Sequence, residues 1–176
     1  MHRFRVYWII LKSLLHPAAR NVDWSEPLIQ HFRIWPWDVE ITRAFTFTYS
    51  SLMSLARWEF CCERVGTLRL FKNKWTPLTY SEHVRFKRSL KLFQRVEVRT
   101  TLFHVNEKMA YFRHQFVAAG TLSAIAYSCG NFHNQKGFAD TAEIFGDLPQ
   151  ELRERGPEAE AWQHFDSAAN AQLGPT

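Results

Sequence analysis

The sequence predicts an α+β fold in which one long helix lies beside an antiparallel sheet. Three patterns lead to this prediction. Apolar residues recur with a helical period from Thr46 to Glu63, residues 78–132 alternate instead, and short connections join the alternating segments. At 176 residues, 46% of them hydrophobic, the chain has enough apolar material for one packed domain.

A first strand is predicted before the long helix. HFRIWPW at residues 31–37 is aromatic and apolar, and it runs into Pro36, where a strand would end. Gly66 is a typical stop signal after the helix. The helix carries an apolar stripe that is predicted to be buried, made of Phe45, Tyr49, Leu52, Ala56 and Phe60.

Four further strands are predicted from alternation, at residues 78–88, 95–105, 110–118 and 121–132. The connections NEK at 106–108 and AAG at 118–120 are short enough for tight antiparallel hairpins. These strands would form one meander beside the helix.

The first 22 residues are basic, with no acid before Asp23, and their apolar run is too short to span a bilayer. On a helical wheel one stripe holds Phe4, Trp8, Leu11 and Leu15, and the side next to it holds Arg5, Lys12, Ser13 and His16. Such a helix could pack on its own domain, dock on a partner protein or lie on a membrane surface. The same pattern resembles a mitochondrial import sequence.

The composition turns acidic and Ala-rich after Lys136-Gly137. Pro149 and Pro157 each stand where a helix could begin. We expect short helices over 138–168 that cover one edge of the sheet, and a frayed end at 169–176. The predicted organisation is therefore a basic amphipathic segment (1–22), a central domain (23–137) and an acidic helical extension (138–176).

The formal charge of +5 is unevenly distributed. Residues 1–136 hold 20 Lys/Arg against 9 Asp/Glu, a net +11, and residues 137–176 hold 2 against 8, a net −6. A basic body suits any anionic partner, including coenzyme A phosphates, an anionic membrane or RNA. The densest basic run, 85–99, is interpreted as a solvated or partner-facing surface. Contact with RNA remains an alternative, because Trp75 and Tyr80 lie nearby and aromatic rings can stack on bases.

Cys61, Cys62 and Cys129 form no C-x-x-C pair, and their odd number argues against a disulfide framework. They are interpreted as small buried hydrophobes in a protein of a reducing compartment, not a secreted one. The eight histidines lack metal-binding spacings, and there is no Gly-rich phosphate loop. No metal site and no cofactor is predicted.

Residues 88–130, RSLKLFQRVEVRTTLFHVNEKMAYFRHQFVAAGTLSAIAYSCG, resemble the core of the 4-hydroxybenzoyl-CoA thioesterase-like hotdog family, and most closely its membrane-associated branch. The pieces that carry the resemblance are Leu90 to Thr100, Glu107, Tyr111 to Val117 and Leu122 to Gly130. The resemblance implies a curved antiparallel sheet wrapped around the long helix. It also implies a homodimer or heterodimer through the sheet, with acyl-CoA sites at the interface.

In that family the first strand leads into D-x-D-x-x-x-H-x-N-N-x-x-Y, where this chain has WDVEITRAFTFTYSSL. Asp38 and Glu40 match the two acids, Ala44 replaces the His, and one residue is missing before Tyr49. By the resemblance the candidate catalytic residues are Glu40 and Asp38, and the candidate substrate-binding residues are Thr46, which replaces the first Asn, Tyr49 and the helix arginine Arg57.

The altered positions bear directly on thioester hydrolysis, which needs a placed carboxylate and donors aimed at the developing oxyanion. The longer side chain of Glu40 shifts its oxygens by more than about 1 Å relative to Asp, and a misplacement on the order of 1 Å can reduce the rate about 100-fold. Non-catalytic interpretations stand beside each role: Asp38 could cap the turn after the first strand, and Glu40 could pair with Arg43. Tyr49 and Phe45 are expected in the core, and Arg57 could hold the helix to a neighbour.

Three functions follow as hypotheses. The favoured one is a catalytically impaired, thioesterase-like subunit of a larger mitochondrial or membrane-associated assembly, attached through its N-terminal helix. The second is an active acyl-CoA thioesterase. The third is a protein that binds acyl-CoA without hydrolysing it.

Overall fold

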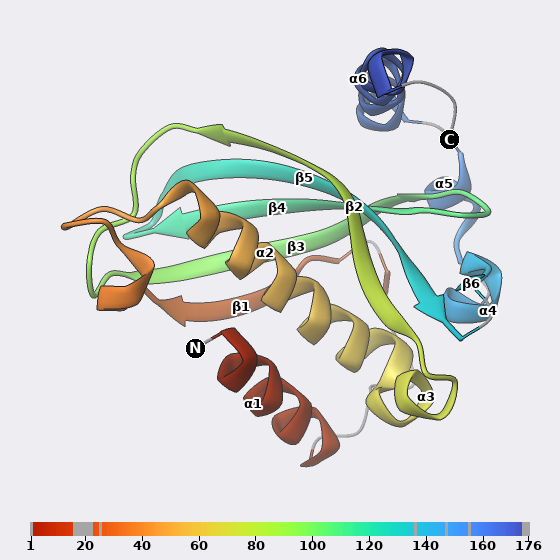
Figure 1. Cartoon of the computed structure of the whole chain (residues 1–176), viewed down its shortest axis with the longest axis horizontal. Helices are drawn as coiled ribbons and strands as arrows, with labels where there is room; N and C mark the ends of the chain where they lie inside the picture. The colour runs from red at the N-terminus through yellow and green to blue at the C-terminus, as the bar shows by residue number, and fades with distance from the viewer. Residues whose placement is uncertain are drawn as a thin grey trace.

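The computed structural model describes residues 2–15, 23–24, 26–135, 137–146, 148–154 and 156–173. Its antiparallel sheet has the strand order β1-β3-β4-β5-β2, with β6 paired to the end of β5. The sheet curves around the long helix α2, with α1 and α3 beyond that helix (Figure 1). The predicted α+β hotdog fold, with an N-terminal helix and a C-terminal helical extension, is confirmed.

The strands are β1 (Leu28–Arg33), β2 (Thr76–Phe86), β3 (Arg95–Val105), β4 (Ala110–Ala118), β5 (Thr121–Asn134) and β6 (Gly137–Phe138). The α-helices are α1 (His2–Leu15), α2 (Thr46–Cys61), α3 (Thr67–Lys72), α4 (Thr141–Phe145), α5 (Gln150–Arg153) and α6 (Pro157–Leu173). A 3-10 turn, Pro36–Asp38, precedes α2, and a π-helical segment, Cys62–Gly66, follows it.

The first strand lies earlier than predicted: β1 ends at Arg33, and the expected strand residues 34–37 lie outside it. Pro36 has no N–H to donate to a neighbouring strand, and it instead starts the 3-10 turn. The turn carries the chain from the sheet edge to the start of α2. Its geometry therefore decides where the motif residues lie.

Gly66 does not end the helical region as predicted. It has φ +100°, which changes the chain direction, and α3 then continues as far as Lys72. The buried stripe on α2 is confirmed for Tyr49, Leu52, Ala56 and Phe60, which are 0–2% exposed. The prediction was wrong for Phe45, which is 36% exposed because it stands before the first helical turn, outside the sheet's cover.

The core lies between α2 and the inner face of the sheet. Alternate residues of β3 and β4 point inward, so Val98, Leu102 and Phe116 are fully buried against the helix. Each such side chain contributes about 1.5–3 kcal/mol of burial free energy. A second cluster around Phe60, Phe112 and other apolar residues fills the end of the sheet nearest α4.

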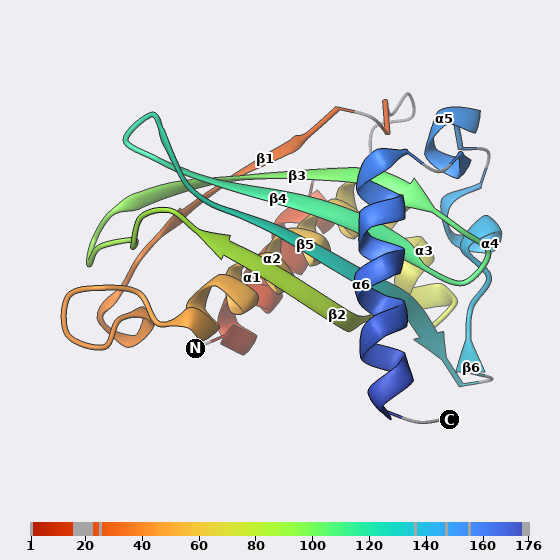
Figure 2. The ribbon, with the colours of Figure 1, turned by 90° about the horizontal axis from the view of Figure 1, so that it is seen from above.

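The C-terminal helices differ from the prediction in their placement. Figure 2 shows α6 crossing the sheet, and its Trp162 packs with Tyr111 and Cys129, which lie on the face of β4 and β5 that is turned away from α2. The helix therefore covers the outer face of the sheet and not an edge. Residues 169–173, expected to be frayed, are helical in α6, and 174–176 lie outside the described residues.

The N-terminal helix packs on its own domain through Ile9, which is 6% exposed, and through Val6. No helix among the described residues is long and apolar enough to cross a bilayer. The division of the chain at residues 22 and 137 stays a prediction.

Candidate functional site

The segment that leads into α2 is a compact loop held by backbone bonds. Val39 and Ala44 pair as an isolated antiparallel bridge, and the Phe45 N–H donates to the Asp38 carbonyl at 3.2 Å. The buried hydroxyl of Thr48 donates to that same carbonyl at 2.6 Å. These bonds fix the acidic motif residues relative to the first turn of the helix.

Both carboxylate oxygens of Asp38 are occupied. Oδ2 accepts the Trp35 N–H at 2.9 Å and Nη2 of Arg5 at 2.7 Å, and Oδ1 accepts Nη1 of Arg5 at 3.3 Å. The residue is 6% exposed. Arg5 comes from α1, so the helix contributes a cation to the motif loop.

Glu40 is placed differently from Asp38. Its backbone N–H donates to the Arg43 carbonyl at 3.0 Å, which closes a tight turn, and its side chain is exposed. Within the described part of the chain, no hydrogen bond or ion pair of its carboxylate is found. The contact with Arg43 is therefore through the backbone and not the side-chain pair considered from the sequence.

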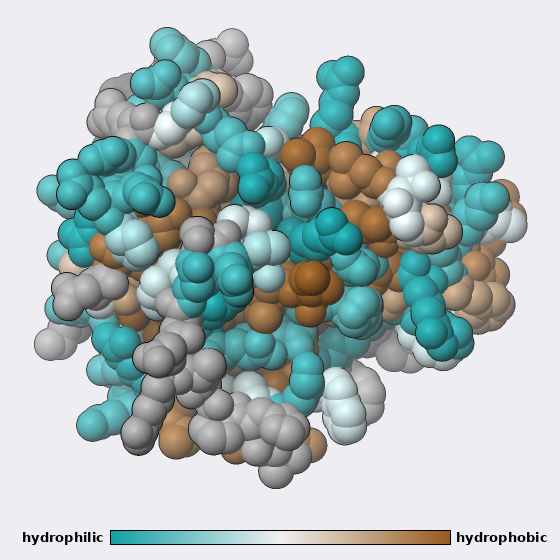
Figure 3. Space-filling model, turned by 180° about the vertical axis from the view of Figure 1, so that it is seen from behind, coloured by the Kyte–Doolittle hydropathy of each residue, from teal (hydrophilic) through white to brown (hydrophobic). Residues whose placement is uncertain are grey.

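The start of α2 has apolar surroundings. Thr46 is its first residue and is exposed, between Phe45 and Phe47, whose rings lie 6.3 Å apart. In the preceding loop Trp35 and Trp37 stack at 5.6 Å. Seen from behind, on the face opposite to the view of Figure 1, brown hydrophobic patches interrupt the hydrophilic surface (Figure 3).

Tyr49 lies in the core one turn further along α2. Its hydroxyl accepts the Leu90 N–H at 3.1 Å, and its ring packs edge-on against Phe86 and Phe116. Burial raises the pKa of the Tyr49 phenol, and the bond from Leu90 opposes that shift. Tyr49 thereby ties α2 to the segment after β2.

Arg57 faces the edge strand β2. Its Nη2 donates to Thr79 Oγ1 and to Glu82 Oε1, the latter at 3.1 Å. Burial lowers the pKa of Arg57, and the nearby Glu82 carboxylate opposes that shift. Arg57 thus contacts β2, whereas Asp38, Glu40 and Thr46 gather at the loop before α2.

A buried chain of hydrogen-bonded polar side chains crosses the inner face of the sheet, and it was not predicted from the sequence. Gln30 donates to the Ala56 carbonyl at 3.0 Å and accepts from Thr100 at 3.3 Å. His114 Nδ1 lies 3.1 Å from Thr100 Oγ1, and Nε2 lies 3.0 Å from Ser128 Oγ. Because the Thr100 hydroxyl donates to Gln30, it accepts from Nδ1–H, which leaves Nε2 to accept from Ser128.

The Ser128–His114 arrangement has the contact of a nucleophile and its base, but both residues are at most 1% exposed. Burial, followed by the charge of Arg57, lowers the pKa of His114 well below its ordinary value of 6.5. The imidazole is therefore neutral and works as a structural hydrogen-bonding group. The signal in the sequence was a polar residue at an inward position on each of four neighbouring strands, β1, β3, β4 and β5.

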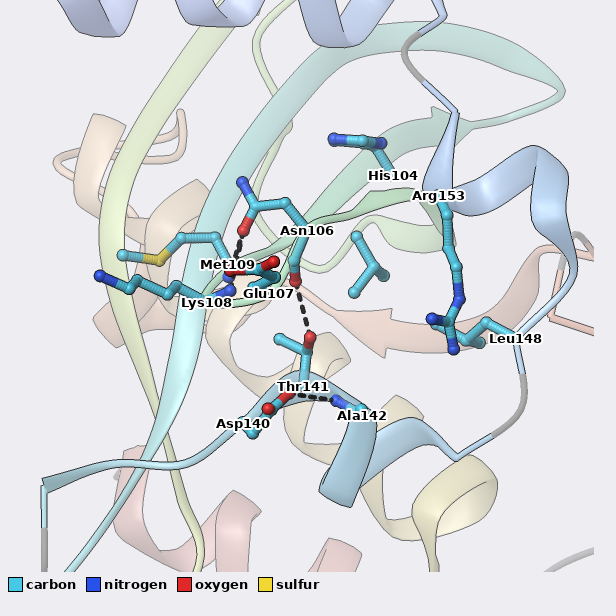
Figure 4. A pocket seen from close by; sticks show the side chains of 11 residues that line it. His104, Asn106, Glu107, Lys108, Met109, Asp140, Thr141, Ala142, Leu148 and Arg153 are labelled. Carbon is cyan, nitrogen blue, oxygen red and sulfur yellow. Dashed lines mark hydrogen bonds between the residues drawn. The ribbon is translucent and has the colours of Figure 1, made fainter.

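The largest cavity described, about 770 Å³, lies between the β3–β4 hairpin and the segment carrying α4 and α5. Figure 4 shows His104, Asn106 and Arg153 around it, with Thr141 bonded to the Asn106 carbonyl at 2.6 Å. This cavity lies at the opposite end of the sheet from the start of α2. It is lined by none of the candidate catalytic and substrate-binding residues, which are Asp38, Glu40, Thr46, Tyr49 and Arg57. A smaller one, of about 400 Å³, lies between α6 and the outer face of β2 and β5. Among the described residues no group of His, Cys, Asp or Glu could hold a metal ion.

Comparison with known proteins identifies the family. The Thioesterase-like superfamily matches residues 24–155, which include the whole sheet and α2. The chain belongs to this superfamily. No curated protein sequence matches it significantly.

Solved structures share the fold of this superfamily member. A gentisyl-coenzyme A thioesterase is 20% identical, with a TM-score of 0.59 over 71% of this chain and 96% of its own. A DHNA-CoA thioesterase from Staphylococcus aureus is 12% identical, with a TM-score of 0.60 over 85% and 97%. A Staphylococcus aureus protein in complex with CoA is 14% identical, with a TM-score of 0.58 over 89% and 90%. At these identities the likeness shows the fold alone.

Proposed function

We propose that this thioesterase-like protein is catalytically impaired and serves as a structural subunit of a larger mitochondrial or membrane-associated assembly. The observation that carries the proposal is the pairing of Asp38 with Arg5. A carboxylate that accepts hydrogen bonds on both oxygens and pairs with a cation is a weaker base and nucleophile, and Arg5 and the Trp35 N–H occupy both oxygens of Asp38.

The rest of the motif supports the same conclusion. Ala44 stands at the His position of the resembled motif, and Thr46 is flanked by Phe45 and Phe47, which provide no side-chain donors. Glu40 retains a carboxylate but lies on an exposed turn, where water screens its charge and none of the described groups orients it. An unoriented base loses the advantage of a fixed attack geometry.

Thiol release from short, medium, long-chain and aryl coenzyme A esters tests the proposed impairment. We expect the purified chain to release thiol no faster than its Glu40→Gln variant. Turnover that the wild type shows and Glu40→Gln loses would contradict the proposal. Circular dichroism of both proteins would establish that each is folded.

An active acyl-CoA thioesterase is the second candidate. The exposed Glu40 carboxylate favours it, because no described group neutralises that charge. In this mechanism Glu40 would act as base or nucleophile, and the backbone N–H groups at the start of α2 would polarise the thioester carbonyl. The same thiol-release assay decides between the two candidates.

Binding of acyl-CoA without hydrolysis is the third candidate, supported by the fold shared with a protein solved in complex with CoA. Calorimetric titration with coenzyme A and its esters measures this binding directly. Saturable binding without thiol release would favour this candidate over the first.

A dimer through the sheet is part of the proposal, and β2 is the edge that favours it. This strand pairs only with β5 among the described strands, and its Leu78, Tyr80 and Phe86 are 46%, 56% and 45% exposed. An exposed strand edge is a template for pairing with another chain. We expect Leu78→Glu combined with Tyr80→Glu to halve the solution mass, whereas Ile29→Glu on the other edge, β1, leaves it unchanged.

The proposed location is a mitochondrial or membrane-associated, reducing compartment. The three cysteines support the reducing environment, since all are buried and none is in a disulfide. The basic segment at residues 1–22 supports the organelle or membrane association. Fluorescence microscopy of the tagged full chain would test the location.

A further inference from the structure

The side of α1 that faces the domain carries polar residues together with the buried Ile9 and the partly buried Val6. Arg5 pairs with Asp38 at 2.7 Å, and Lys12 pairs with Glu59 of α2 at 2.8 Å. Near the end of the helix, Thr67 of α3 donates to Ser13 at 2.7 Å. These contacts, together with buried Ile9, fix the rotation of α1 about its axis.

The apolar side of α1 consequently faces outward. Tyr7, Trp8, Leu11 and Leu14 lie on neighbouring turns and are 68%, 62%, 52% and 48% exposed. The helix cannot turn these side chains inward without breaking both ion pairs. A helix on a soluble domain usually turns its large apolar side chains inward, so a row of exposed ones on α1 is unusual.

The short helix α3 extends the same surface. It contacts α1, and Figure 1 shows both helices at the lower side of the molecule, away from α6. Its Leu68 and Phe71 are 76% and 53% exposed. We name the six exposed apolar residues the α1–α3 surface: Tyr7, Trp8, Leu11, Leu14, Leu68 and Phe71.

Cations border the α1–α3 surface. Lys72 and Lys74 are exposed just after Phe71, and Arg69 lies one residue after Leu68. Lys12 is half-exposed on α1, and Glu59 beside it is already paired with that lysine. Glu63 also lies near Lys12. The four cations outnumber these two acids, so the border is net positive.

We infer that the α1–α3 surface binds peripherally to an anionic lipid bilayer. Tryptophan and tyrosine have an apolar body and a polar tip, which suits the boundary between headgroups and acyl chains. Leucine and phenylalanine add apolar area, and lysines beside them are attracted to anionic headgroups. The inference rests on the proposed membrane-associated role and names its physical partner.

The shape and charge of the surface favour lipid over a protein. A protein partner docks a few anchors into pockets, and neither of the two cavities described above is lined by a residue of the α1–α3 surface. The surface is instead formed by exposed side chains of two neighbouring helices, with cations at its border. A fluid bilayer needs no matching hollow, and it supplies both an apolar interior and negative charge.

Sedimentation of the full chain with vesicles tests the inference. One set of vesicles contains phosphatidylcholine with phosphatidylglycerol, and the other contains phosphatidylcholine alone. The variants are Trp8→Ser with Leu11→Ser, and Lys72→Gln with Lys74→Gln. The matched control is Phe138→Ser, which removes an apolar side chain that is 63% exposed on β6.

We expect binding to the anionic vesicles that is at least about tenfold stronger than to the neutral ones and weakens with added salt. Trp8→Ser with Leu11→Ser should reduce it by about tenfold or more, and the lysine pair by about tenfold, whereas Phe138→Ser should not change it. Because the substituted side chains are exposed, thermal unfolding of these variants should match the wild type.

Three outcomes would overturn the inference: no vesicle binding by the wild type, equal loss in Phe138→Ser, or release of a protein partner by Trp8→Ser with Leu11→Ser while vesicle binding is unchanged. The first two outcomes leave the proposed function untouched, and the third would refute lipid binding while it supports a place in an assembly. Failure of the lipid inference and failure of the proposed function are therefore distinguishable.

Discussion

Arg5 and Asp38, 33 positions apart in the sequence, are joined by two hydrogen bonds, Nη2 to Oδ2 at 2.7 Å and Nη1 to Oδ1 at 3.3 Å. One contact links α1, the turn after β1 and the start of α2. Since the pair is largely buried, each charge depends on the other for its compensation.

Arg5→Met should therefore destabilise the protein. We expect the free energy of unfolding in urea to fall by about 1–3 kcal/mol, because Asp38 loses its charged partner while it remains buried. Arg99→Met is the matched control: its pair with Glu97 is more exposed, so the loss there should stay below about 1 kcal/mol. Equal effects of the two substitutions would contradict a structural role of the Arg5 pair.

His114 should make stability depend on pH. Its pKa in the folded protein lies well below 6.5, so as the pH falls the unfolded chain binds the proton first. The contribution of neutral His114 to the free energy of unfolding is therefore complete above pH 6.5. Below that pH it is lost by up to about 1.4 kcal/mol per pH unit, until the pH reaches the pKa of the folded protein. Urea unfolding at several pH values should show a shallower slope for His114→Gln than for the wild type. His133→Gln, at an exposed imidazole, is the control, and an unchanged slope in His114→Gln would refute the assignment.

Gly130 should not tolerate a side chain. A Cβ there would lie 2.3 Å from the Leu78 carbonyl oxygen of β2, next to the bulge between Thr79 and Ser81. We expect Gly130→Ala to lower the unfolding free energy by about 1–3 kcal/mol, because the backbone of β2 must shift. Gly156→Ala, where a Cβ meets nothing within 4 Å, should stay near the wild type. Similar stabilities of the two variants would argue against this packing of β2 on β5.

The cysteines should react slowly with thiol reagents in the folded protein. All three are buried, and burial raises the pKa of the Cys61 and Cys62 thiols, which reduces the reactive thiolate. Reaction with a chromogenic disulfide should be at least about tenfold faster in denaturant, because the thiols are then exposed at their ordinary pKa. Rapid labelling of all three in the folded state would contradict their burial.

The sheet could be predicted because its pattern is local. Residues 95–105 and 110–118 alternate clearly, and β3 and β4 have those bounds. The placement of β1 and α6 could not be predicted in the same way. Trp162 of α6 packs on Tyr111, 51 positions earlier, and composition alone does not show whether a helix covers a face or an edge of a sheet.

The candidate site also combines features that a local pattern predicts with features that depend on contacts between distant segments. The motif pointed to Asp38 and Glu40, but it did not show that Arg5 pairs with the Asp38 carboxylate while the Glu40 side chain is exposed. The helical pattern of residues 1–22 placed Arg5 among polar neighbours on one side of the predicted helix. That pattern did not show that Arg5 faces the domain. Likewise, Thr100, His114 and Ser128 meet only once the register of three strands brings them together.

Native purification of the full chain from its source, followed by mass measurement of the intact particle, tests the central claim most directly. A structural subunit predicts a particle in which this chain is present in fixed proportion to other proteins. A particle that contains only copies of this chain, and that hydrolyses acyl thioesters, would contradict the account.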